Sequence, residues 1–184
     1  MTSNPTSRLL AAILLTCACG TENAVVPVED WEPATDKVPM AAPLFHAHVS
    51  ASSTPDPLMA TNCVPAGDEV WLHVPATAGD IVHGVSSGGG VGAGPCSVRL
   101  GLCLDVLPPM TYLGNVVAGL VLGADGNDYG SVPFAIDASA EAGSRTWLQG
   151  VVEDGSDSEI SFAIEVEVCS DSWPGGSGDP GGSS

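Results

Sequence analysis

The segment EISFAIEVEV, residues 159–168, alternates between apolar and mostly polar positions. A period of two places successive side chains on opposite faces of an extended strand. The alternation predicts one buried face, formed by Ile160, Phe162, Ile164, Val166 and Val168. We therefore predict a β-strand here with one solvent-exposed face and one apolar face. In the predicted fold, the apolar faces of several such strands are buried against each other.

Other segments show a similar pattern, and turn sequences rich in Gly, Asp and Pro separate them. Turns of this kind can reverse an antiparallel pair of strands. Helix-favouring Lys, Arg and Gln are scarce, whereas the chain contains 23 Gly and 15 Pro. Besides 159–168, the predicted strands are 44–50, 69–75, 80–86, 111–121, 131–137 and 145–153. We predict an all-β fold over residues 44–170, a single immunoglobulin-like β-sandwich of about seven antiparallel strands, whose order the sequence leaves open.

The first 18 residues are predicted to be a secretory signal. A polar start containing Arg8 is followed by an apolar run at 9–15, which is too short to span a membrane as a helix. Small residues and cysteine end the run. The segment resembles a bacterial lipoprotein signal, in which cleavage occurs just before a cysteine that is then acylated. Cys19 is the predicted lipidation site, because Ala18 precedes it, and Cys17 is the alternative.

The predicted location follows from this signal. Gly20 is not the Asp that resembles an inner-membrane retention signal, so we expect an exported protein anchored in the outer membrane or at the cell surface. Residues 19–43 are predicted to be an acidic, Pro-containing tether, and 171–184 a disordered tail rich in Gly, Ser and Pro. Trp31 and Trp173 lie in these end segments, where a partner could use them as anchors.

The charge of the chain restricts its partners. Four basic residues face 22 acidic ones, for a formal net charge of -18. Such a surface repels phosphate backbones and anionic head groups, which argues against nucleic acid. We expect a monomer that meets the membrane through its lipid and that contacts an envelope or extracellular protein or a polysaccharide.

The remaining cysteines are predicted to form disulfides. With Cys19 acylated and Cys17 removed, Cys63, Cys96, Cys103 and Cys169 remain as an even set in an oxidising compartment. They show neither C-x-x-C spacing nor a downstream histidine at zinc spacing. We predict the pairs Cys96–Cys103 and Cys63–Cys169, although the other pairings of the four stay open.

Several short motifs occur in the second half of the chain: GPC at 94–96, LCLD at 102–105, a Leu-Gly pair at 113–114, an Asp-Gly hairpin at 125–126 and LQGVV at 148–152. Together they resemble a β-sandwich module of secreted proteins and lipoproteins from myxobacteria and related bacteria. The resemblance extends from about residue 67 to 168. It implies the fold and an exported location, and it provides no catalytic residues.

Candidate metal ligands are the histidines and the acidic loops. Four imidazoles occur within 38 positions, and the His-x-His pair directs two of them to one side of an extended segment. Copper, zinc or calcium binding is therefore conceivable, although solvated histidines and solvated turns explain the same residues. The candidate ligands are His46, His48, His73, His83, Asp125 and Asp128, and the acidic stretch 153–159 is a further calcium candidate.

The sequence does not favour an enzyme. The stretch 84–88 fits the G-x-S-x-G pattern around Ser86, but glycines rather than a helix follow it and no histidine comes after His83. We predict a non-catalytic, lipid-anchored envelope protein with a binding, adhesion or scaffolding role and no required cofactor. The alternative is a small metal-binding envelope protein.

Overall fold

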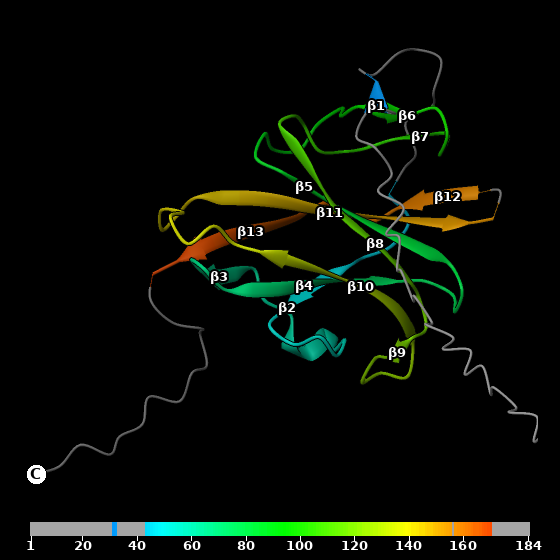
Figure 1. Ribbon diagram of the computed structural model, residues 1–184, viewed down its shortest axis with the longest axis horizontal. Helices are drawn as coiled ribbons and strands as arrows, with labels where there is room; N and C mark the ends of the chain where they lie inside the picture. Colours follow the sequence, from blue (N-terminus) through cyan, green and yellow to red (C-terminus); the bar gives the residue numbers. More distant parts are fainter. Residues whose placement is uncertain (1–30, 33–42, 156, 171–184) are drawn as a thin grey trace, which may run out of the picture.

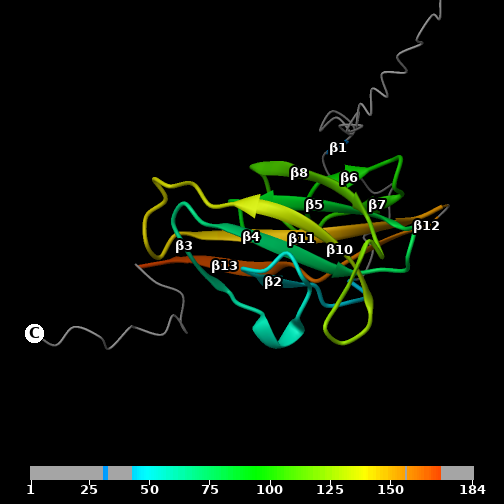
Figure 2. The same ribbon diagram turned by 60° about the horizontal axis from the view of Figure 1, so that its bottom comes forward.

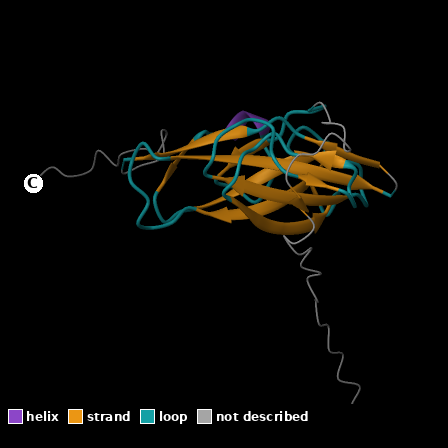
Figure 3. Ribbon diagram, turned by 90° about the horizontal axis from the view of Figure 1, so that it is seen from above, coloured by secondary structure: helices purple, strands orange, loops and turns teal. Residues whose placement is uncertain are grey.

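The computed structural model describes residues 31–32, 43–155 and 157–170 (Figure 1). The predicted signal, the lipidation sites Cys19 and Cys17 and the predicted tail at 171–184 lie outside these residues. Strands dominate the described chain (Figure 3). They are β1 (Trp31–Glu32), β2 (His48–Ser50), β3 (Cys63–Pro65), β4 (Glu69–Pro75), β5 (Ile81–Ser87), β6 (Cys96–Ser97), β7 (Leu102–Cys103), β8 (Met110–Val117), β9 (Val121–Leu122), β10 (Asp128–Ala135), β11 (Arg145–Asp154), β12 (Asp157–Ile160) and β13 (Ile164–Cys169), with one 3-10 turn, η2 (Pro57–Met59). Within the described residues, no helix is long and apolar enough to cross a bilayer.

Two sheets form an immunoglobulin-like sandwich. The smaller sheet has the order β2-β4-β10-β9 and the larger one the order β3-β13-β11-β5-β8. All their pairings are antiparallel except the parallel pair of β3 and β13. This order matches the two-sheet arrangement of immunoglobulin domains, with the first strands divided between the sheets. The predicted all-β sandwich is confirmed, and the structure supplies the strand order.

The space between the two sheets is filled mainly by valines. This first core contains Val49, Val64, Val70, Leu72, Val74, Val82, Ala118, Val132, Ile136, Leu148, Val152, Val166 and Val168. Three glycines let valines of the opposite sheet approach the backbone: Val74 lies against Gly150, Val132 against Gly84 and Val82 against Gly130. The absence of a Cβ at these three positions therefore determines how closely the sheets pack.

A further layer covers the other face of the larger sheet. The excursion at 88–109 carries the β6–β7 hairpin, and β1 adds to the edge of β6 (Figure 1). Beneath it lies a second core, made of Val85, Leu100, Leu102, Leu104, Val106, Val151 and Ile160. Both faces of β11 are consequently buried, so that Val151 belongs to the second core and its neighbour Val152 to the first.

The predicted strand at 159–168 is interrupted, and its predicted common face is wrong. Val151 pairs with Ile160 and Leu148 with Ile164, so two residues of β11 face three of the partner segment. This is a β-bulge, and the extra residue shifts the alternation between faces by one position. Ile160 therefore enters the second core while Val166 and Val168 enter the first, and Phe162 is 43% exposed.

Ser161 and Gln149 hold the bulge. The Gly150 amide donates to Ser161 Oγ at 2.9 Å, and the Ser161 amide donates to the Gly150 carbonyl at 2.9 Å. Gln149 Nε2 donates to the Ser161 carbonyl at 2.8 Å, while Gln149 Oε1 accepts from the Asp105 amide at 3.0 Å. The buried polar groups at the bulge are thus paired, and the same network ties the excursion to β11.

Both predicted disulfides are present. Cys63 on β3 is bonded to Cys169 on β13 with a Cα–Cα distance of 5.6 Å, and Cys96 is bonded to its cross-strand partner Cys103. The first bridge joins the start of the domain to its last strand, and the second closes the β6–β7 hairpin. Disulfides are compatible with an exported protein.

The tip of the smaller sheet is fixed by a loop-to-loop contact. The Ala124 amide, in the loop between β9 and β10, donates to the Pro55 carbonyl just before η2 at 2.8 Å. The two loops project from the same side of the molecule (Figure 2). Leu58 on η2 is 93% exposed, and Leu120, in the turn between β8 and β9, is 79% exposed.

Candidate functional site

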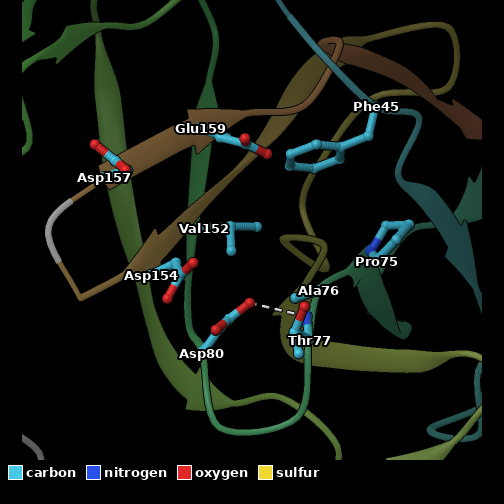
Figure 4. Close-up of a pocket in the computed structure, with 9 residues that line it drawn as sticks. All are labelled: Phe45, Pro75, Ala76, Thr77, Asp80, Val152, Asp154, Asp157 and Glu159. Carbon is cyan, nitrogen blue, oxygen red and sulfur yellow. Dashed lines mark hydrogen bonds between the residues drawn. The ribbon is translucent and has the colours of Figure 1, made fainter.

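A cavity of about 400 Å³ opens between the two sheets at one end of the sandwich (Figure 4). We call it the acidic pocket. It is lined by Phe45, Pro75, Ala76, Thr77, Asp80, Val152, Asp154, Asp157 and Glu159. This volume lies in the range of pockets that bind small molecules or side chains.

Three chain segments position the lining. The turn between β4 and β5 supplies 75–80, where the Asp80 carboxylate accepts from the Thr77 amide at 2.8 Å. The β11–β12 hairpin supplies 152–159, and its strands pair from Val151 with Ile160 to Asp154 with Asp157. Phe45 enters ahead of β2, where it forms a parallel bridge with Ser161 at the bulge.

The lining combines an apolar floor with carboxylates. Figure 4 shows Asp154 and Asp157 on one side of Val152 and Pro75 and Ala76 on the other, with Glu159 next to the Phe45 ring. The arginines of the described residues are engaged elsewhere: Arg99 with Glu153, and Arg145 with Glu165 and Glu167. Within the described chain the pocket carboxylates form no ion pair, so the pocket presents net negative charge next to apolar surface.

The structure separates the four candidate histidines into three places. His46 is exposed and stacks on Phe162, with ring centroids 4.5 Å apart. His48 and His73 are cross-strand neighbours whose ring centroids are 4.8 Å apart. His83 lies on the other face of the larger sheet, against Tyr112. Only His48 and His73 come together.

His73 is fully buried, which corrects the interpretation that it lies on a solvated face. Its Nε2 lies 2.9 Å from the Ser52 carbonyl, and its Nδ1 lies 2.8 Å from Ser131 Oγ. The carbonyl can only accept, so Nε2 carries the proton and Nδ1 accepts from the Ser131 hydroxyl. Burial, followed by the nearby His48, lowers the pKa of His73 to about 4.

His83 is also buried, at 3% exposure, rather than solvated. Its Nε2 lies 3.1 Å from Glu153 Oε2 and its Nδ1 2.9 Å from the Tyr112 hydroxyl. Arg99 Nη1 donates to both oxygens of Glu153, at 2.9 and 3.2 Å. Burial lowers the pKa of His83 despite the neighbouring carboxylate. Burial would raise the pKa of Glu153, but hydrogen bonds from His83 and Arg99 outweigh it and lower that pKa.

The candidate metal ligands are not assembled into a site. Among the described residues, no group of three or more His, Cys, Asp or Glu side chains could hold a metal ion. Asp125 instead accepts from the Asn127 side-chain amide at 2.7 Å and from the Tyr129 hydroxyl at 2.9 Å, and Asp128 lies at the start of β10. Metal binding stays a prediction, which thermal melts with calcium, zinc and copper would test.

Ser86 of the G-x-S-x-G pattern lies inside strand β5. It is 7% exposed, and its hydroxyl lies 3.5 Å from the Thr111 carbonyl of the neighbouring strand. A nucleophile elbow would place the serine at a sharp strand-to-helix turn.

Sequence reasoning found part of the acidic pocket. The acidic stretch at 153–159 was a calcium candidate, and its Asp154, Asp157 and Glu159 line the cavity. Phe45 and Asp80 were missed, because each is far from that stretch in the sequence and carries no local motif.

Comparisons with family models, curated proteins and solved structures found no match for this chain. The resemblance to the myxobacterial module therefore stays a prediction from the sequence motifs.

Proposed function

We propose that this protein is a non-catalytic, lipid-anchored cell-envelope protein that binds a partner through the acidic pocket. The observation that carries the proposal is the pocket itself, whose carboxylates face apolar floor residues and lack basic partners in the described chain. A lysine or arginine side chain of an envelope or extracellular protein fits this chemistry, since its apolar stem can cover Val152 and Phe45 while its charged end meets the carboxylates.

The charge of the whole chain supports a cationic partner. A formal net charge of -18 attracts positively charged surfaces over several ångströms and accelerates their association.

A peptide titration tests the pocket. The probe is a hexapeptide of alternating arginine and leucine, and amide chemical shifts of the protein are recorded as it is added. We expect the shifts to concentrate at residues 76–80 and 152–159. The double variant Asp154→Asn/Asp157→Asn should weaken binding by about tenfold or more, because two charges at the site are lost.

The matched control removes the same charge elsewhere. Glu69→Gln/Glu141→Gln neutralises two exposed carboxylates outside the pocket lining and should change the dissociation constant by less than about twofold. Equal losses in both double variants, or shifts spread over the whole surface, would reduce the binding to general attraction between charges and refute the pocket.

The anchor is tested separately. Metabolic palmitate labelling should survive Cys17→Ser and disappear with Cys19→Ser, and the reverse result would move the acylation site. Crosslinking on intact cells, compared between the unmodified protein and Asp154→Asn/Asp157→Asn, would then identify the partner that the pocket holds.

A further inference from the structure

The sequence assigns Trp31 and Glu32 to the tether, yet the structure docks them on the domain. They form β1, which pairs antiparallel with β6, with Trp31 opposite Ser97 and Glu32 opposite Cys96. The Trp31 side chain is partly buried and packs against the second core. A segment from outside the sandwich sequence therefore completes the layer over the larger sheet.

The surface that receives Trp31 is held in place without it. Cys96 and Cys103 are cross-strand partners joined by a disulfide, so the hairpin is closed covalently. Leu102 and Leu104 below are buried at 1% and 0% exposure. The Gln149 side chain also fixes the excursion to β11 through the Asp105 amide. The edge of β6 is thus a preformed strand edge beside apolar side chains, which suits an extended segment carrying an aromatic residue.

We propose that Trp31 and Glu32 are a releasable strap, which holds the N-terminal segment against the β6–β7 hairpin. Within the described residues, the strap contributes two residues of pairing and one partly buried side chain, that of Trp31. Short elements with few buried contacts open at lower free energy than the core of a domain. The strap consequently opens while the sandwich stays folded.

Docking at Trp31 shortens the stretch of sequence between the proposed lipid site and the first residue that pairs with the domain. From Cys19 to Trp31 the sequence advances 12 positions, and from Cys19 to Pro43 it advances 24. Fully extended, these segments reach about 40 Å and about 80 Å. With the proposed lipid at Cys19, release of the strap doubles the length of sequence between the lipid and the first docked residue, so the acidic pocket can meet partners farther from the membrane. This consequence rests on the proposed function, whereas the docking of Trp31 does not.

Hydrogen exchange on the purified mature chain tests the strap. Trp31→Ala should raise the amide exchange rate of Cys96 by about fivefold or more, because the Cys96 amide faces β1 and loses its strand partner. Trp31→Phe should keep most of the protection, and Trp173→Ala, which changes a tryptophan outside the described residues, should leave it unchanged. In every variant, protection at 151–154 should stay at the level of the unmodified protein.

A second variant approaches the contact from the other side. Cys96→Ser/Cys103→Ser opens the covalent closure of the hairpin, and we expect faster exchange at residues 31–32. Unchanged exchange at 31–32 in this variant, or at Cys96 in Trp31→Ala, would overturn the strap. Loss of protection at 151–154 in Trp31→Ala would make Trp31 part of the cooperative core and not a strap.

A dimer that dissociates with Trp31→Ala would place the docking of Trp31 between two copies of the chain and would likewise overturn the strap. Palmitate labelling is independent of all these outcomes, so failure of the strap and failure of the anchor are distinguishable.

Discussion

Gly84 on β5 lies so close to Val132 on β10 that a Cβ atom at Gly84 would be 2.8 Å from Cγ1 of Val132. The cross-strand partner of Gly84 is Gly150, which lies against Val74 in the same way. Two neighbouring glycines on the larger sheet thus accept two valines from the smaller sheet. The close packing of the sandwich depends on this interlocking.

We predict that Gly84→Ala destabilises the domain by about 1–3 kcal/mol, because the added methyl group overpacks a rigid core. Gly88→Ala is the matched control, since the nearest atom to its Cβ, Pro109 Cγ, is 3.9 Å away. It should change the free energy of unfolding by less than about 0.5 kcal/mol. Denaturant unfolding measures both, and equal effects would show that the sheets can separate to accommodate the methyl group.

The two disulfides are predicted to contribute unequally. Their cysteines are separated by 106 and 7 positions in the sequence. Chain-entropy estimates give a stabilisation of about 4.8 kcal/mol for the long loop and about 2.4 kcal/mol for the short one. Cys63→Ser/Cys169→Ser should therefore lower the free energy of unfolding more than Cys96→Ser/Cys103→Ser. The opposite order would mean that the excursion depends on its bridge more than the sandwich does.

Glu153 is predicted to stabilise the protein mainly through buried His83. Glu153→Ala leaves the His83 Nε2 donor without its acceptor, which should cost about 1–3 kcal/mol of unfolding free energy. Glu153→Gln keeps an acceptor oxygen and should recover most of that loss. Glu165→Ala is the control, because its pair with Arg145 is exposed and should contribute at most about 1 kcal/mol. A loss with Glu153→Gln as large as with Glu153→Ala would assign the effect to the charge.

Burial of neutral His73 should make the protein less stable in mild acid. Its pKa is lowered from 6.5 to about 4 in the folded state, so the unfolded chain binds more protons between these values. The contribution of neutral His73 to the free energy of unfolding is therefore complete above pH 6.5. It decreases as the pH is lowered and levels off near pH 4, with about 3 kcal/mol lost over this window.

His73→Gln removes the titrating group and keeps a side-chain donor. Its free energy of unfolding should fall less steeply between pH 6.5 and 4 than that of the unmodified protein. A remaining slope of the same sign is expected, because burial also lowers the pKa of His48 and His83. Identical slopes in the two proteins would show that His73 does not titrate differently on folding.

The sequence by itself determined the fold class and the positions of most strands, and it indicated two disulfides while leaving their pairing open. The segment 69–75 forms β4 with the predicted bounds, because its alternating pattern is bounded by turn residues on both sides. Cysteine parity indicated two bridges, and the structure shows that the preferred pairs, Cys63–Cys169 and Cys96–Cys103, are the ones that form. These features can be recognised from the sequence, because strand periodicity, turn residues and the number of cysteines depend on local residue patterns or on simple counts.

Only the tertiary structure decided which strand faces are exposed to solvent and which distant residues contact each other. One extra residue at Ser161 reverses the alternation, so Ile160 and Val166 enter different cores despite their matching pattern. The sequence alone suggests that His83 is a solvent-exposed polar residue of a strand. In the structure the excursion covers its side of the larger sheet, and Arg99 of the excursion pairs with Glu153, the carboxylate that also contacts His83. The acidic pocket joins Phe45, Asp80 and Glu159 from three distant segments. Periodicity reports which side of a strand a residue is on, whereas burial and site formation depend on what a distant part of the chain packs against that side.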